Sequence, residues 1–484
     1  MKDKVVKGAF WVFGIKIIGY IFSFVRITIL GRLLLPSDFG IMGIALLTIS
    51  IFETFTQVGF RQALIQKKEG IEKYLDSAWT FLIIRGFFIY LLIFFFSYFS
   101  SSFFKTPEAN AIIKVFGLSI IISSFTNIGV VYFQKEFEFN KQFFYEFLGS
   151  IMDFIISITF VIVLRNVWAL VIGALAGHLT RCIVSFIIIP YKPKFNFNID
   201  EIKELWDFGR WATLSNILIF FSTQGDDIFV GRFLGSFSLG LYQMAYRISN
   251  MPATEITHVI SSVSFPAYSK LQDENERLRN AYLKIYQMTS FFSFLLAGLI
   301  FTLSDDFIRL FLTSKWEPAI PSIKILSIEG LLRSIAATTG PIFYAIKKPK
   351  METFLQFIRF LILIIFIYPL TSRYGISGTS FCVLLSVLVS TIGFIIMCRR
   401  LINFNLNTLL RISFFSFICA FFMPFLYNFI KKFTGINVFY LEFFILAFLI
   451  VIIYSFIFIL FSRFMYINQI KLIKEVCNEF FKKT

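Results

Sequence analysis

Residues 31–40 read GRLLLPSDFG, and residues 231–240 read GRFLGSFSLG. Both segments begin with Gly-Arg and end with Gly, so that Gly31 corresponds to Gly231 at an offset of 200 residues. The same offset relates two further pairs, Trp11 with Trp211 and Ala45 with Ala245. A repeat at a fixed offset predicts a duplicated chain with two like halves. In a membrane protein, this organisation is typical of transporters.

The composition is that of a membrane protein. Hydrophobic residues make up 57% of the 484 residues, and the mean hydropathy is +0.78, whereas soluble proteins have roughly 45–50% apolar residues. Apolar runs of about 20 residues, the length that crosses a bilayer as a helix, recur along the chain. We therefore predict an all-α integral membrane protein whose short connections leave no room for a soluble domain.

Fourteen membrane spans are predicted from these apolar runs. The first run lacks a small-residue cleavage site and is interpreted as a retained span, not a removed signal. The predicted spans cover residues 8–30, 41–65, 78–101, 110–133, 143–164, 167–190, 208–234, 238–265, 281–303, 321–346, 351–371, 374–398, 409–430 and 438–462.

Lysine and arginine residues alternate in density between successive connections. The dense side includes Lys2, Lys67, Lys135, Lys347 and Lys471, and the positive-inside rule makes that side cytoplasmic. Both termini are then cytoplasmic, which agrees with an even number of spans. The net charge of +17 is explained by these loops beside an anionic leaflet, not by nucleic-acid binding.

The repeat and the topology together predict the domain organisation. An even number of crossings separates the two copies, so the halves are parallel repeats related by an axis along the membrane normal. Spans 13 and 14 fall outside this six-plus-six repeat. The predicted parts are an N-terminal lobe at 1–190, a cytoplasmic linker at 191–207, a C-terminal lobe at 208–400, extra helices at 401–462 and a cytoplasmic tail at 463–484.

The sequence holds no signature of an enzyme. It has two histidines, no HExxH, GxSxG or P-loop motif, and no long loop with paired carboxylates. Its five cysteines are scattered without CxxC spacing, so neither disulfides nor a metal site are expected. We predict a protein without cofactor or metal.

Ionisable side chains inside the spans are the candidate functional residues, because a charge at the bilayer centre costs at least roughly 2.5–3.5 kcal/mol. Several are cationic and come from both halves. Facing a central cleft, they would suit an anionic group such as a phosphate or diphosphate. The predicted substrate-binding residues are Lys16, Arg26, Arg61, Arg85, Arg247 and Arg333; Arg181 and Arg359 also lie in spans.

Some of these charged residues could have a structural role in place of substrate binding. Arg26 and Arg61 lie within about two turns of a helix end and could extend to the headgroups. Glu329 and Arg333 are four residues apart on one helix and could neutralise each other.

Acidic residues within spans could couple transport to an ion gradient, because a buried carboxylate takes up H⁺ or binds Na⁺. Asp226 and Asp227 could instead pair with Arg232 near the outer surface. The candidates for ion coupling are Glu53, Asp153, Asp226, Asp227 and Glu255.

The chain resembles the Wzx-type oligosaccharide-lipid flippases of the MOP exporter superfamily, and is most similar to the colanic-acid exporter branch. The resemblance covers about residues 1–400. It rests on GRLLLPSDFGIMGIA (31–45), GFRQALIQKKE (59–69), FQKEFEFNK (133–141), GRFLGSFSLGLYQMAYRI (231–248), FPAYSKLQDENERLR (265–279) and KWEPAIPSIKILSIEGLLRS (315–334).

The resemblance implies two six-helix lobes around a central cleft in the bacterial cytoplasmic membrane, with alternating access. It implies an undecaprenyl-diphosphate-linked sugar repeat unit as substrate, for O-antigen, capsule or exopolysaccharide. A polysaccharide polymerase and chain-length machinery are the expected partners. A drug or metabolite antiporter and a peptidoglycan-precursor flippase on the same fold are the alternatives; a membrane glycosyltransferase or polymerase is disfavoured by the missing carboxylate loops.

Overall fold

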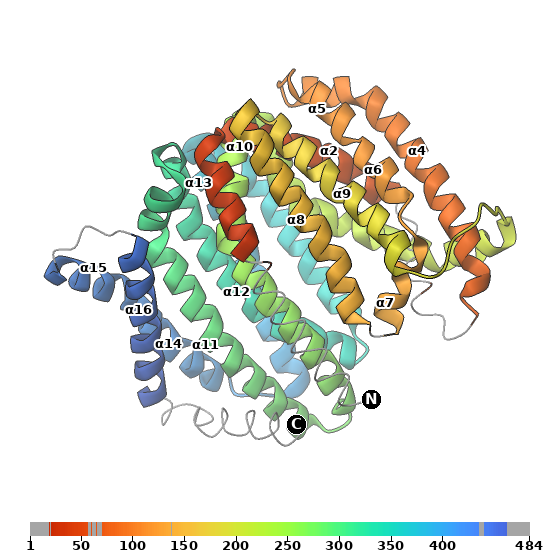
Figure 1. Ribbon diagram of the computed structural model, residues 1–484. Helices are drawn as coiled ribbons and strands as arrows, with labels where there is room; N and C mark the ends of the chain where they lie inside the picture. Colours follow the sequence, from red (N-terminus) through yellow and green to blue (C-terminus); the bar gives the residue numbers. More distant parts are fainter. Residues whose placement is uncertain are drawn as a thin grey trace. The chain divides into compact units, whose positions relative to one another are not determined.

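The computed structural model is mainly helical over the residues that it describes, which are 19, 21–56, 60, 64, 70–136, 138–434 and 440–461 (Figure 1). A first helix covers residues 21–33. The following elements are α2 (Pro36–Thr56), α4 (Glu72–Phe103), α5 (Ala109–Phe116), α6 (Leu118–Ser124), η1 (Ile128–Val130), α7 (Val131–Lys135), α8 (Phe139–Leu164), α9 (Trp168–Ile188), α10 (Ile199–Lys270), α11 (Asn275–Phe307), η2 (Ile308–Leu312), η3 (Ser314–Ala319), α12 (Ile320–Ala345), α13 (Pro349–Ile402), α14 (Leu406–Phe421), α15 (Met423–Thr434) and α16 (Tyr440–Phe461).

Within the described residues, eight helices are long and apolar enough to cross a membrane. One of them, α13, contains two predicted spans, because the chain leaves helical geometry at Gly375, which has φ +57°. The all-α membrane fold is therefore confirmed. The chain divides into two compact units, Met1–Gly240 and Leu241–Lys483, which are described separately below.

In the first unit, the helices break at matching places in the two copies of the repeat. The first helix ends at residue 33, and α2 begins at Pro36, whose ring suits the first position of a helix. In α10 the chain leaves helical geometry at Gly235, where φ is +84°. Gly235 corresponds to Leu35, so the structure repeats the same break at the same offset as the sequence.

The two copies also contact each other reciprocally. A Cβ atom built on Gly40 would lie 1.7 Å from the carbonyl oxygen of Ser236, and one built on Gly240 would lie 1.8 Å from that of Pro36. At the offset of 200 residues, Ser236 corresponds to Pro36 and Gly240 to Gly40. The glycine of each copy therefore contacts the same position of the other copy. This is the contact pattern of a two-fold axis. No side chain fits at either glycine without moving the backbone.

One predicted span is wrong as a continuous helix, and another is bent. The span predicted at 110–133 ends at Ser124, because Asn127 accepts a hydrogen bond from the N–H of Gly129 at 2.9 Å and caps a 3₁₀ turn. The span predicted at 409–430 is confirmed, because Leu406–Lys432 is apolar and long enough to cross a membrane, and it bends at Phe422 between α14 and α15. Pro424, two residues later, lacks the N–H that would continue the helical hydrogen bonds from the preceding turn.

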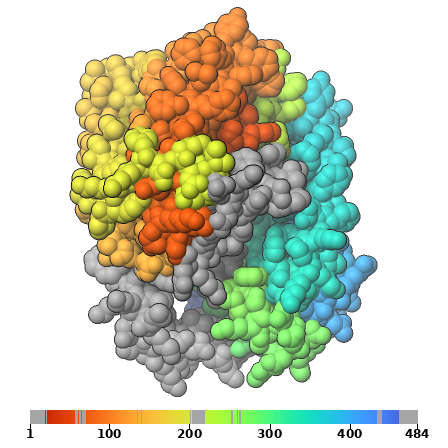
Figure 2. All heavy atoms as spheres, turned by 90° about the vertical axis from the view of Figure 1, so that its right-hand side faces the viewer, coloured from red at the N-terminus to blue at the C-terminus, as the bar shows by residue number. Residues whose placement is uncertain are grey.

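The start of the predicted linker lies on the N-terminal end of α4, where Figure 2 shows residues near 195 in yellow-green beside orange atoms. The carboxylate of Asp76 accepts a hydrogen bond from the hydroxyl of Tyr191 and one from the N–H of Lys194. The N–H of Asn196 donates to Thr80 at 3.0 Å. Burial, with the hydrogen bond to Asp76, raises the pKa of Tyr191, so this hydroxyl stays a neutral donor. The linker is thus held by α4.

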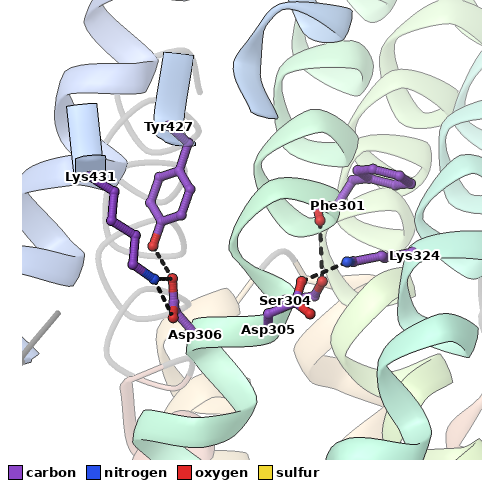
Figure 3. A network of polar contacts seen from close by, with 7 residues as sticks. All are labelled: Phe301, Ser304, Asp305, Asp306, Lys324, Tyr427 and Lys431. Carbon is purple, nitrogen blue, oxygen red and sulfur yellow. Dashed lines mark hydrogen bonds and ion pairs between the residues drawn. The ribbon is translucent and has the colours of Figure 1, made fainter. Parts of the chain in front are cut away.

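In the second unit, neighbouring carboxylates on α11 hold two other helices, as Figure 3 shows. Asp305 pairs with Lys324 of α12 at 2.6 Å. Asp306 accepts hydrogen bonds from Tyr427 and from Lys431 of α15, the latter at 2.9 Å. These contacts attach the C-terminal helices to the rest of the unit.

Candidate functional site

The predicted site residues of the first unit form contacts between helices. Arg26 donates to the carboxylate of Asp153 on α8 at 2.7 Å and to the hydroxyl of Ser157 at 3.3 Å. The two charged side chains are 23% and 17% exposed. In this structure Arg26 is therefore held by an ion pair and does not extend alone to the headgroups, and Asp153 is its partner.

Arg85 closes the end of α2. It donates to the main-chain oxygens of Thr56 at 2.7 Å and of Glu53 at 3.1 Å. Carbonyl groups in the last turn of a helix have no partner within the helix, and a cation there also interacts favourably with the helix dipole. This arginine thus anchors α4 to the end of α2.

Arg232 has a similar role within the repeat. It donates to the main-chain oxygen of Phe103 at 2.7 Å and lies 5.1 Å over the ring of the same residue. Arg232 thereby fixes the end of α4.

The other predicted residues are distributed along the chain. Lys16 and Arg61 lie outside the described residues. Arg247 is exposed on α10, and Glu53 is exposed at the end of α2. Asp226 is buried in α10, whereas Asp227 and Glu255 are half-buried. None of these carboxylates lines the pocket described next.

A pocket of about 440 Å³ lies within the second unit and is lined by residues of α10, α12 and α13. Its volume is in the range of ligand sites, roughly 300–1,000 Å³. The polar lining residues are Thr257, Arg333, Tyr344, Glu352, Gln356, Arg359 and Ser390.

Arg333 enters the pocket from α12 and is oriented by α10. Its guanidinium donates to the hydroxyl of Tyr246 at 2.7 Å and to that of Thr254 at 2.9 Å. The pair expected between Glu329 and Arg333 is not formed, because Arg333 turns to α10 instead. Glu329 is fully buried, and neither carboxylate oxygen has a hydrogen-bond partner among the described residues.

Arg359 enters the same pocket from α13. Within the described part of the chain, its guanidinium makes no hydrogen bond or ion pair. It lies in a helix that is apolar and long enough to span a membrane. A cation in such a place requires an anion or water in the cavity that it faces.

Two oxygens at the pocket also lack partners. Oε2 of Glu352 and the hydroxyl of Thr257 are buried without a hydrogen bond among the described residues. A tight turn places Glu352 here, since α12 ends at Ala345 and Pro349 begins α13. Lys347 in that turn adopts φ +58°. The pocket thus offers two guanidinium groups, an acceptor and a hydroxyl to a polar ligand.

Of these lining residues, Arg333 is among the substrate-binding residues predicted from the sequence, whereas Arg359 was noted only as lying in a span and Glu352 was not identified. Glu352, Gln356 and Arg359 have the spacing i, i+4, i+7, which places them on one face of a helix. Three polar residues on one face of an otherwise apolar span are the sequence pattern from which these pocket residues could have been predicted. Glu352 was missed because it lies one residue inside its predicted span, beside Lys350 and the cytoplasmic loop.

The ion pair of Arg26 and Asp153 yields a stability prediction. Asp153→Asn leaves the guanidinium half-buried without its charge partner, and we expect a loss of about 1–3 kcal/mol in unfolding free energy. Thermal unfolding of the purified protein measures it. The double change with Arg26→Gln should recover part of the loss. Glu138→Gln is the control, since its pair with Lys141 is exposed and contributes little. An unchanged melting temperature for Asp153→Asn contradicts the assignment.

The helical fold, the internal repeat and the pocket lined by arginines define the class of protein. It is a helical membrane transporter built from two like halves. The model of a family described as polysaccharide biosynthesis proteins matches residues 29–321, more than half of the chain. The chain belongs to this family, and the resemblance to Wzx-type flippases is confirmed.

Individual relatives agree with this assignment. The lipopolysaccharide biosynthesis protein WzxC of Escherichia coli K12 is 27% identical over 354 residues, which cover 71% of this chain and 70% of WzxC. A membrane protein encoded in the cps region of Klebsiella pneumoniae is 27% identical over 438 residues, which cover 88% of this chain and 87% of the relative.

Solved structures show the same fold. The lipid II flippase MurJ in an inward closed conformation matches with a TM-score of 0.77 and 17% identity, over 93% of this chain and 98% of MurJ. An inward-facing MATE-family multidrug transporter matches with a TM-score of 0.65 and 16% identity, over 79% and 94% of the two chains. At these identities the likeness concerns the fold alone.

Proposed function

We propose that this protein is a flippase that moves oligosaccharide repeat units, linked to undecaprenyl diphosphate, across the bacterial cytoplasmic membrane for surface polysaccharide biosynthesis. The observation that carries the proposal is the pocket with two arginines, of which Arg359 has no partner among the described residues. A diphosphate diester carries two negative charges and several acceptor oxygens. Guanidinium groups bind such oxygens in pairs and remain charged at every relevant pH.

In this proposal Arg333 and Arg359 hold the diphosphate, while the lipid tail stays in the membrane. Arg26 and Arg85 act by holding helices in place, and Lys16, Arg61 and Arg247 contribute positive charge along the path. The lobes at 1–190 and 208–400 rock about the linker and expose the site alternately to the cytoplasm and to the outside. Both termini are cytoplasmic, and the helices at 401–462 are an addition to the repeat.

The energy source and the partners form the finer part of the proposal. The in-span carboxylates Glu53, Asp226, Asp227 and Glu255 are the proposed coupling groups for H⁺ or Na⁺, whereas Asp153 is engaged with Arg26. A polysaccharide polymerase and its chain-length machinery are the proposed partners that receive the translocated unit. We propose a transporter without enzymatic activity.

The pocket also separates the rival functions. For a drug antiporter of organic cations a more anionic site is expected, whereas this pocket has two arginines and one glutamate. A peptidoglycan-precursor flippase shares the diphosphate chemistry and differs only in the attached sugar. A glycosyltransferase needs a nucleotide-sugar site, so sugar transfer by the purified protein would favour that class.

Reconstitution tests the proposal directly. Purified protein in proteoliposomes should move a fluorescent undecaprenyl-diphosphate oligosaccharide between leaflets, measured as the fraction that an added glycosidase can reach. We expect a rate at least about tenfold above protein-free vesicles, with no acceleration for an undecaprenyl lipid without phosphate or sugar. Equal rates with and without protein would refute the flippase assignment.

A further inference from the structure

The pocket of the second unit has two chemically different parts. Arg333 and Arg359 supply positive charge from α12 and α13, whereas Glu352 supplies negative charge from the start of α13. Glu352 forms no ion pair with either arginine in the described residues, although all three line one cavity. Because this carboxylate forms no ion pair with the guanidinium groups that line the same cavity, it is available to a ligand.

The surroundings of Glu352 indicate what that ligand must offer. Its Oε1 lies 3.7 Å from the place where a Cβ on Gly340 would stand, so residue 340 contributes no side chain on this side of the carboxylate, next to Tyr344. Its Oε2 is buried without a partner. An ionised carboxylate only accepts hydrogen bonds, and a buried oxygen without a donor is costly. A ligand that fits must therefore bring O–H or N–H groups to Glu352.

Other lining residues fit a sugar ring. Gln356 lies one helical turn beyond Glu352, and Tyr344 lies beside the carboxylate. The Thr257 hydroxyl is a further buried group without a partner. Phe394, which is buried and stacked on Phe343, adds an apolar wall. A sugar has an apolar ring face and a rim of hydroxyl donors, and the pocket offers matching surfaces for both.

We infer that Glu352 determines which sugar the protein accepts next to the diphosphate: it accepts hydrogen bonds from hydroxyl or ammonium groups and disfavours a sugar that carries a carboxylate. This inference rests on the proposed function. The two arginines match the two charges of the diphosphate, so a third negative charge on the adjacent sugar would face Glu352 without a cation to balance it. Repulsion between like charges in a sheltered site is strong.

The test uses the full-length protein in nanodiscs and four probes. These are farnesyl diphosphate and its conjugates with glucose, glucosamine and glucuronic acid, and binding is measured by isothermal titration calorimetry. We expect the glucose conjugate to bind about tenfold more tightly than the glucuronic acid conjugate, because one charge-assisted contact of this kind is worth a factor of that order.

Glu352→Gln should change the order of the conjugates. The glucuronic acid conjugate should bind about tenfold more tightly than to the wild type, the glucosamine conjugate should bind more weakly, and the glucose conjugate should change by less than about threefold. Glu352→Asp should retain the wild-type order. Glu317→Gln, an exposed glutamate paired with Arg309, is the matched control and should change nothing.

The outcomes separate this inference from the proposed function. Unchanged binding of farnesyl diphosphate shows that Glu352→Gln is folded. If that variant then discriminates among the conjugates as the wild type does, Glu352 is not the specificity residue, and the flippase assignment stands. If the wild type binds neither farnesyl diphosphate nor any conjugate, the diphosphate site fails and the inference falls with it.

Discussion

Arg359→Glu is expected to abolish the export of surface polysaccharide, to below about 1% of the wild-type amount. The change replaces a cation that lines the proposed diphosphate-binding pocket by an anion, so a diphosphate bound there would meet repulsion in place of a guanidinium group. The loss of one charge-assisted contact and the added repulsion together exceed about 3 kcal/mol, which corresponds to more than a hundredfold in affinity. The measurement is the amount of surface polysaccharide in cells whose only flippase is the variant.

Two controls make this result specific to the pocket. Arg309→Gln removes an exposed arginine of the same unit, 63% exposed in its pair with Glu317, and should leave export unchanged. Membrane levels of each variant, followed with a fluorescent fusion, show that the protein is inserted. Full export by an inserted Arg359→Glu variant would overturn the assignment of the pocket. Arg333→Gln should also reduce export, but it additionally removes contacts to Tyr246 and Thr254.

Gly40→Ala and Gly240→Ala are each expected to destabilise the protein strongly. Each added Cβ would lie within 2 Å of a main-chain oxygen, 1.7 Å in one case and 1.8 Å in the other. Backbone atoms cannot rotate away, so two helices must separate, and we expect a loss of at least about 3 kcal/mol. Thermal unfolding of the purified variants, together with the yield of monodisperse protein, measures the effect.

Gly19→Ala is the matched control, since a Cβ there would meet nothing within 4 Å. In a helix this change is neutral or slightly stabilising, by up to about 1 kcal/mol. Because both glycines permit the same close approach, the double variant should lose less stability than the sum of the single losses. A single variant that melts at the wild-type temperature contradicts the reciprocal contact.

Much of the fold could be predicted from the sequence, because the positions of the helices follow from hydrophobic patterns that are local in the sequence. Long apolar runs define the helices, and the offset between Gly31 and Gly231 predicted the matching breaks near Leu35 and Gly235. An error arose where a polar side chain forms a hydrogen bond to the nearby main chain and ends a helix. Asn127 ends one predicted span by capping a turn, which hydropathy averaged over a window does not resolve.

The candidate site was less predictable. Hydropathy indicates whether a charged residue lies inside a membrane span, but not which residues of other helices lie next to it. Arg26 and Asp153 are 127 residues apart in the sequence, and nothing local indicates that they meet. Arg333 lines the pocket, but its guanidinium group contacts Tyr246 and Thr254 and does not pair with Glu329. Competing contacts on α10 decide the orientation of the guanidinium group, and these exist only in the folded chain.

The adjacent carboxylates at the end of α11 have a consequence for how that helix can move. Successive residues of an α-helix point about 100° apart around its axis. Asp305 is held by Lys324 on one side and Asp306 by Lys431 on another, so both directions are fixed at once. α11 can tilt together with its neighbours, but it cannot turn about its own axis without breaking one of the two ion pairs.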